Sequence, residues 1–153
     1  MSHLAEVVRQ AFRDRPPGRL INRGHPAGDL LEAYRWELLE EGEAGLRLRC
    51  HVPDALRNPQ GHLFGGFTPT YVDLVAICTV RTAQRETAPA PLGWLVTLNM
   101  RVDYFDPVLH DFELKSRVIR QRGANYWVET RFVGDDGALL AQGLTTLRET
   151  AAR

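Results

Sequence analysis

A polar loop and the apolar segment that follows it carry the residues best suited to chemistry. Gly65 and Gly66 stand where a helix should begin, and free backbone N–H groups at a helix N-terminus can bind a negatively charged oxygen. Asp73 lies two turns further along, where an ionised carboxylate among apolar residues requires a functional or structural reason. The stretch 58–84 therefore predicts an active site that combines a backbone anion site with an acid or base.

The segment that positions these groups has the pattern of a buried helix. Its apolar residues fall on most sides of a helical wheel: Phe67, Tyr71, Leu74, Val75, Cys78 and Val80. A helix that is apolar nearly all round should be buried nearly all round. We predict that this helix ends near Gln84.

Strand patterns flank the helix on both sides. Alternating apolar and polar residues predict two strands before it and four after it, over residues 34–38, 46–52, 96–104, 112–118, 125–133 and 138–148. Asp135, Asp136 and Gly137 give a strong hairpin signal between the last two strands. Strands on both sides of a single helix indicate an α+β fold, an antiparallel sheet wrapped around one long central helix.

Composition limits the class of protein. The chain has 153 residues, which predicts a single domain over 1–153, with an N-terminal helix and arm at 1–33 and a core at 34–148. A formal net charge of +0 argues against nucleic-acid or membrane-surface partners. The two cysteines give no disulfide framework or metal spacing, and no leader or spanning segment is evident. We therefore expect a soluble cytoplasmic protein.

On these residues the chain resembles the hotdog-fold acyl-CoA thioesterases, in particular the branch with the phenylacetate-pathway and 4-hydroxybenzoyl-CoA-like enzymes. The resemblance covers residues 34–148 and is most specific where that branch has the pattern N-x-x-G-x-x-H-G-G followed by D, here Asn58, Gly61, Phe64, Gly65, Gly66 and Asp73. The departure is Phe64 in place of the histidine, and any role of that histidine is not carried over. The resemblance implies a hotdog fold.

The resemblance also implies hydrolysis of an acyl-CoA thioester. The Gly65 N–H would stabilise the oxyanion, and Asp73 would act as the general base or as the nucleophile. Asn58 would orient the attacking water or brace the loop, and the hydroxyl of Thr97 would assist from the following strand. Taken alone, Asp73 could equally be a carboxylate in a structural hydrogen bond, and Asn58 a turn residue.

Substrate contacts and partners follow from the same resemblance. Gly66, Phe64 and His62 would contact the thioester, and Arg120 and Arg122 would contact the CoA phosphates, with a solvated turn as the alternative reading of the two arginines. No metal or other cofactor is implied, because CoA is part of the substrate. The family implies a homodimer with active sites at its interface and further assembly into a homotetramer.

Two other functions remain open at this level. A non-catalytic acyl-CoA-binding or sensing protein could share the fold, although Asp73 argues against it. A hotdog dehydratase or hydratase would need a catalytic histidine in a different motif, and the central loop lacks it.

Overall fold

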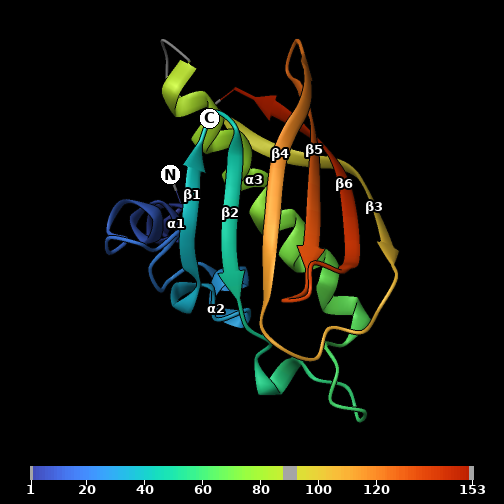
Figure 1. Cartoon of the computed structure of the whole chain (residues 1–153). Helices are drawn as coiled ribbons and strands as arrows, with labels where there is room; N and C mark the ends of the chain where they lie inside the picture. Colours follow the sequence, from blue (N-terminus) through green and yellow to red (C-terminus); the bar gives the residue numbers. More distant parts are fainter. Residues whose placement is uncertain (1, 88–92, 152–153) are drawn as a thin grey trace.

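The computed structural model describes residues 2–87 and 93–151. Within these residues six antiparallel strands form one sheet, in the order β1-β2-β4-β5-β6-β3. Figure 1 shows the long helix α3 (Thr68–Thr87) lying across one face of this sheet. The strands are β1 (Glu37–Gly42), β2 (Gly45–Cys50), β3 (Trp94–Tyr104), β4 (Phe112–Arg122), β5 (Asn125–Val133) and β6 (Leu139–Thr150). The predicted α+β architecture is confirmed.

Helix α3 packs against all six strands, because most of its circumference is apolar. The core is centred on Tyr71, whose ring stacks on Trp36 at 5.5 Å and meets Phe112 and Phe132 edge-on at 5.6 and 5.9 Å. Gly143 on β6 lets the helix approach closely, since a Cβ at this position would lie 2.5 Å from a methyl group of Val72. The sheet and its core residues therefore determine where α3 and its side chains lie.

The chain enters the sheet later than the sequence predicts. The first strand was expected from residue 34, but Ala33–Arg35 form a 3₁₀ turn and β1 begins at Glu37. The turn follows Glu32, whose φ of 52° lies in the left-handed region, and it directs Trp36 into the core. The N-terminal helix α1 (His3–Arg13) lies beside β1 at the edge of the sheet (Figure 1), and α2 (Pro26–Leu30) contacts α3.

Strand β3 forms the opposite edge of the sheet and does not keep one alternation along its length. Its register against β6 shifts between Thr97 and Asn99, which indicates a bulge at Leu98. Before the bulge Leu95 is buried while Val96 is 41% exposed, and Leu98 itself is 54% exposed. After the bulge Met100 and Val102 pack against the core. The bulge therefore leaves apolar side chains on an open sheet edge.

No helix formed by residues 2–87 and 93–151 is both long enough and apolar enough to span a membrane.

Candidate active site

The paired glycines form a short 3₁₀ turn, η3 (Gly65–Phe67), that continues directly into α3. Phe64 before them is extended, with φ −61° and ψ 127°, and its carbonyl accepts a hydrogen bond of 2.9 Å from the Phe67 N–H. Across the described chain, the N–H groups of Gly65 and Gly66 have no acceptor, and both residues are exposed. Two free donors therefore stand at the positive end of a long helix, where an oxyanion would be stabilised.

Tyr104, at the end of β3, contacts this turn. Its hydroxyl donates a hydrogen bond of 2.6 Å to the Gly65 carbonyl. No sequence motif predicts this contact, because an aromatic residue at the end of a strand is an ordinary feature and the hydrogen bond joins residues 39 positions apart.

Asp73 is held by the edge strand. The Thr97 hydroxyl donates a hydrogen bond of 2.5 Å to one carboxylate oxygen of Asp73, and within residues 2–87 and 93–151 the other oxygen has no donor. Asp73 is half-buried, not fully buried as a helix apolar on all sides predicts, and it shares a half-buried stripe of the helix with Ile77 and Arg81. The arrangement fixes the carboxylate and leaves one of its oxygens available to water or substrate.

Gly65 and Asp73 cannot act on the same atom within one chain. They are eight residues apart along a helical segment, which corresponds to roughly 12 Å along the helix axis. Reacting groups must approach within about 3–3.5 Å of one centre. This spacing favours a site that takes the two groups from two copies of the chain.

Asn58 organises the loop that precedes the glycines. Its side-chain oxygen accepts hydrogen bonds of 3.0 Å from the backbone N–H groups of Gln60 and His62. The backbone N–H of Asn58 donates to the His62 carbonyl at 2.7 Å. Gly61 completes the turn with φ 85°, a conformation that favours glycine. The side-chain oxygen is thus committed to bracing the loop, and orientation of water by the amide nitrogen remains a prediction.

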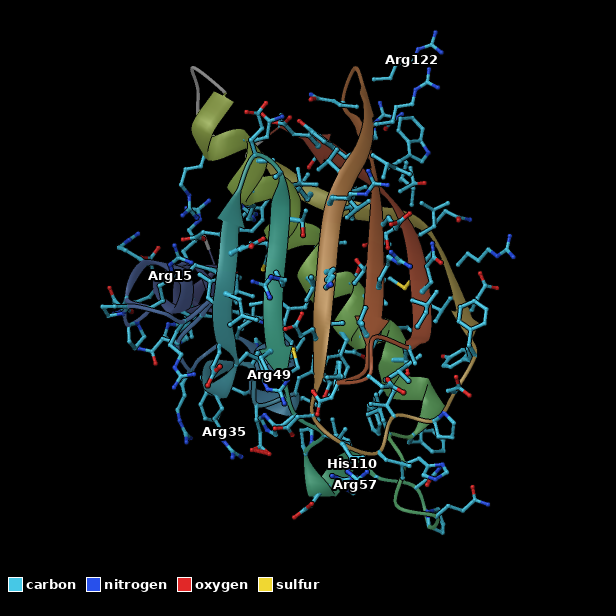
Figure 2. All side chains as sticks on the ribbon, in the orientation of Figure 1. Arg15, Arg35, Arg49, Arg57, His110 and Arg122 are labelled. Atoms are coloured by element: carbon cyan, nitrogen blue, oxygen red, sulfur yellow. The ribbon has the colours of Figure 1, made fainter. Side chains whose placement is uncertain are left out.

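Arg57 ties the same loop to the segment before β4, a contact that no sequence motif signalled. Its guanidinium donates to the Gly61 carbonyl at 2.6 Å and to the Leu109 carbonyl at 3.0 Å. Figure 2 shows Arg57 beside His110 at this end of the molecule. Phe64 extends from the loop with 53% of its surface exposed and meets Phe67 edge-on at 5.8 Å. The loop is therefore braced before any substrate binds.

Arg120 and Arg122 lie far from the glycines of their own chain. Both are exposed near the end of β4, and Figure 2 shows Arg122 at the end of the sheet opposite Arg57. Neither arginine forms an ion pair with any residue that the structure describes. They could therefore bind an anionic ligand, but they are too far from Gly65 of the same chain to share one ligand with it.

The cysteines offer no alternative nucleophile. Cys50 and Cys78 are both buried, and burial raises the pKa of each thiol, to about 12 for Cys78. A thiol of such high pKa carries almost no reactive thiolate at neutral pH. Among the described residues no group of three or more His, Cys, Asp and Glu side chains is placed to hold a metal ion.

Comparison with known families assigns the chain. The family model of the thioesterase superfamily matches residues 60–141, which include the paired glycines, Asp73 and Thr97 but not Asn58. The chain belongs to the thioesterase superfamily. No curated protein matches it in sequence, and the predicted branch of the family remains a prediction.

Solved structures confirm the hotdog fold of this thioesterase-superfamily chain. A candidate esterase from Mycobacterium tuberculosis has a TM-score of 0.70 at 17% identity, covering 84% of this chain and 98% of the other. A thioesterase from Haemophilus influenzae has a TM-score of 0.68 at 16% identity, covering 82% of each chain. A hypothetical thioesterase from Streptococcus pneumoniae, crystallised with coenzyme A, has a TM-score of 0.66 at 18% identity, covering 78% and 88%.

Proposed function

We propose that the protein is an acyl-CoA thioesterase that hydrolyses its substrate to a free acid and CoA. The observation that carries the proposal is the Asp73 carboxylate, which is fixed by Thr97 and has one free oxygen, on the helix that directly follows the Gly65–Phe67 turn. The free oxygen of this carboxylate could take a proton from water or attack a carbonyl carbon. The coenzyme A complex of the Streptococcus pneumoniae neighbour supports CoA thioesters as the substrate class.

The proposed reaction places the thioester carbonyl oxygen at the Gly65 N–H. As the carbonyl carbon is attacked its oxygen becomes negative, so this hydrogen bond strengthens in the transition state. In one route Asp73 takes a proton from water, the hydroxide adds to the carbonyl carbon, and the CoA sulfur leaves with that proton. In the other route an Asp73 oxygen attacks directly, CoA leaves, and water hydrolyses the resulting anhydride. Both routes consume one water and regenerate the carboxylate.

The proposed enzyme is a two-fold homodimer. Strand β3 presents an open edge with exposed Val96 and Leu98, a surface prone to pairing with another strand. If two copies pair through β3 across a two-fold axis, their strands run antiparallel. Opposite ends of the two sheets then lie side by side, which would bring Arg120 and Arg122 of one subunit to the same end as Gly65 of the other. A second subunit would also cover the exposed glycine turn and exclude water.

A free-thiol release assay over aliphatic and aromatic acyl-CoAs tests this function. We expect turnover of at least one acyl-CoA that exceeds the uncatalysed rate, because the site combines an oxyanion donor with a carboxylate. The preferred acyl group in the panel then defines the substrate class. Tight binding of acyl-CoAs without release of thiol would instead identify a binding or sensing protein and contradict the proposal.

The two arginines give a second prediction. Replacing Arg120 and Arg122 together by glutamine should raise KM for acyl-CoA about tenfold, because each guanidinium would lose a charge-assisted hydrogen bond to phosphate. KM for the corresponding acyl-pantetheine, which lacks the nucleotide, should not change. The matched control is Arg13→Gln, which removes an exposed charge on α1. Equal increases in KM for both substrates would show that the arginines do not contact the nucleotide.

A further inference from the structure

The Gly65–Gly66 peptide unit is held from its carbonyl side by a side chain of the edge strand. The Gly65 oxygen accepts two hydrogen bonds, one from the backbone N–H of Thr68 within the turn and one of 2.6 Å from the Tyr104 hydroxyl. The Tyr104 ring lies alongside Gly65, with its Cε1 atom 3.7 Å from where a Cβ would be. The backbone after Tyr104 is itself anchored, since the N–H groups of Phe105 and Asp106 both donate to the Leu140 carbonyl, at 2.9 and 3.1 Å. Tyr104 therefore reaches the turn from a fixed position.

Geometry links this contact to the N–H of the next residue. The Gly65 carbonyl and the Gly66 N–H belong to one planar peptide unit, and in a trans peptide they point in opposite directions. A hydrogen bond that fixes the carbonyl toward Tyr104 therefore directs the Gly66 N–H away from Tyr104. Donation to the carbonyl also polarises the unit and strengthens its N–H as a donor.

The neighbouring peptide is held in the same way. The Phe64 carbonyl accepts the Phe67 N–H at 2.9 Å, and the Gly65 N–H of that peptide is free within the described chain. Both consecutive peptide units thus have a bound carbonyl and an unused N–H. Such pre-oriented donors need no reorganisation when negative charge develops, which is what makes oxyanion stabilisation effective.

Resting on the proposed thioesterase function, we infer that Tyr104 is a positioning residue that makes the Gly66 N–H a second oxyanion donor beside Gly65. The phenol does not touch the substrate; it acts through the Gly65–Gly66 peptide unit. Glycine at 66 suits this role, because a Cβ there would lie 3.0 Å from a ring carbon of Phe64 and would displace either the ring or the turn.

Nuclear magnetic resonance can observe this single peptide unit directly. Gly65 and Gly66 are the only adjacent glycines in the sequence. In protein labelled with glycine carrying both ¹³C at the carbonyl and ¹⁵N, an experiment that correlates an amide with the preceding carbonyl gives one peak, from the Gly66 amide and the Gly65 carbonyl. Tyr104→Phe should shift that carbon upfield, because the carbonyl loses one of its two hydrogen bonds and keeps only the one from the Thr68 N–H. Tyr126→Phe, which removes a hydroxyl bonded to Gln84 and Gln121, should leave the peak in place.

Kinetics of the same two variants test the consequence for catalysis. Tyr104→Phe should lower kcat about tenfold and change KM little, because the lost polarisation matters most when the oxyanion forms. Tyr126→Phe should retain wild-type kcat. An unshifted peak, or an unchanged kcat, in Tyr104→Phe would overturn the role of Tyr104 while wild-type turnover upholds the thioesterase. Absence of wild-type turnover would overturn the proposed function and the donor role with it.

Discussion

Replacing Asp73 by asparagine should lower kcat for acyl-CoA hydrolysis by about 10²–10⁴-fold, the contribution expected of a general base, or abolish it if Asp73 is the nucleophile. Asparagine has the shape of aspartate, and its side-chain oxygen can still accept the 2.5 Å hydrogen bond from Thr97. The fold and the position of the side chain should therefore survive. The loss would report on the negative charge and the basicity of the carboxylate. Thiol release under saturating substrate measures it.

A matched control removes a carboxylate that lies outside the candidate site. Glu6→Gln removes a charge from the exposed face of α1 and should leave kcat unchanged. Binding of an acyl-CoA to Asp73→Asn, measured by calorimetry, should remain close to that of the wild type. A kcat unchanged in a folded Asp73→Asn protein would show that the carboxylate is structural and that the chemistry lies elsewhere.

The parts of this structure that the sequence predicts are those set by local pattern. The apolar residues around α3 predict a helix that ends near Gln84, and the observed helix extends to Thr87. The helix could be predicted because burial on nearly all sides leaves little choice of secondary structure. The strands β4, β5 and β6 follow their alternation for the same reason. The spacing of Gly65 and Asp73 also placed both groups on one helical segment, since helix geometry converts sequence distance directly into axial distance.

Long-range contacts decided the features that the sequence did not predict. Tyr34, Trp36 and Leu38 alternate as a strand would, yet the left-handed conformation at Glu32 and the 3₁₀ turn after it place Trp36 against Tyr71. A two-residue period cannot distinguish a strand from a turn that buries one large ring. Tertiary packing therefore overrides the local pattern at the start of β1.

The bulge in β3 was equally invisible to the pattern. A single inserted residue moves the following side chains to the other face of the sheet. Apolar residues nevertheless alternate in the sequence both before and after the bulge, so the alternation does not reveal it. With the bulge at Leu98, Thr97 faces Asp73 while the apolar Val96 and Leu98 stay exposed. These outward apolar residues suggest pairing with another chain, which one sequence alone does not reveal.

Gly65→Pro should lower kcat by about 10²–10³-fold, the usual effect of removing one oxyanion donor. Proline lacks the N–H, but the site can otherwise accept it. Gly65 is the first residue of a 3₁₀ turn, where proline is favoured, and the extended conformation of Phe64 suits a residue before proline. The expected loss is therefore one of catalysis, with the thermal unfolding midpoint close to that of the wild type.

Gly65→Ala is the matched control for this substitution. Alanine keeps the N–H, and its Cβ would lie 3.7 Å from the Tyr104 ring, an ordinary van der Waals distance. We expect its kcat to stay within a few-fold of the wild type. If proline and alanine reduced kcat equally, the N–H would not be the essential element and steric effects at the turn would explain both.

Mixing the two inactive variants tests whether each active site draws on two subunits. Unfolding and refolding Asp73→Asn together with Gly65→Pro should produce heterodimers in which one of the two sites has an intact Gly65 from the first chain and an intact Asp73 from the second. Activity of the mixture should therefore rise well above the residual activity of either variant alone, and it should peak at equal amounts of the two. Sites built within single chains would give no recovery at any ratio. The separation of roughly 12 Å between the two groups, measured along the turn and α3, makes recovery the expected result.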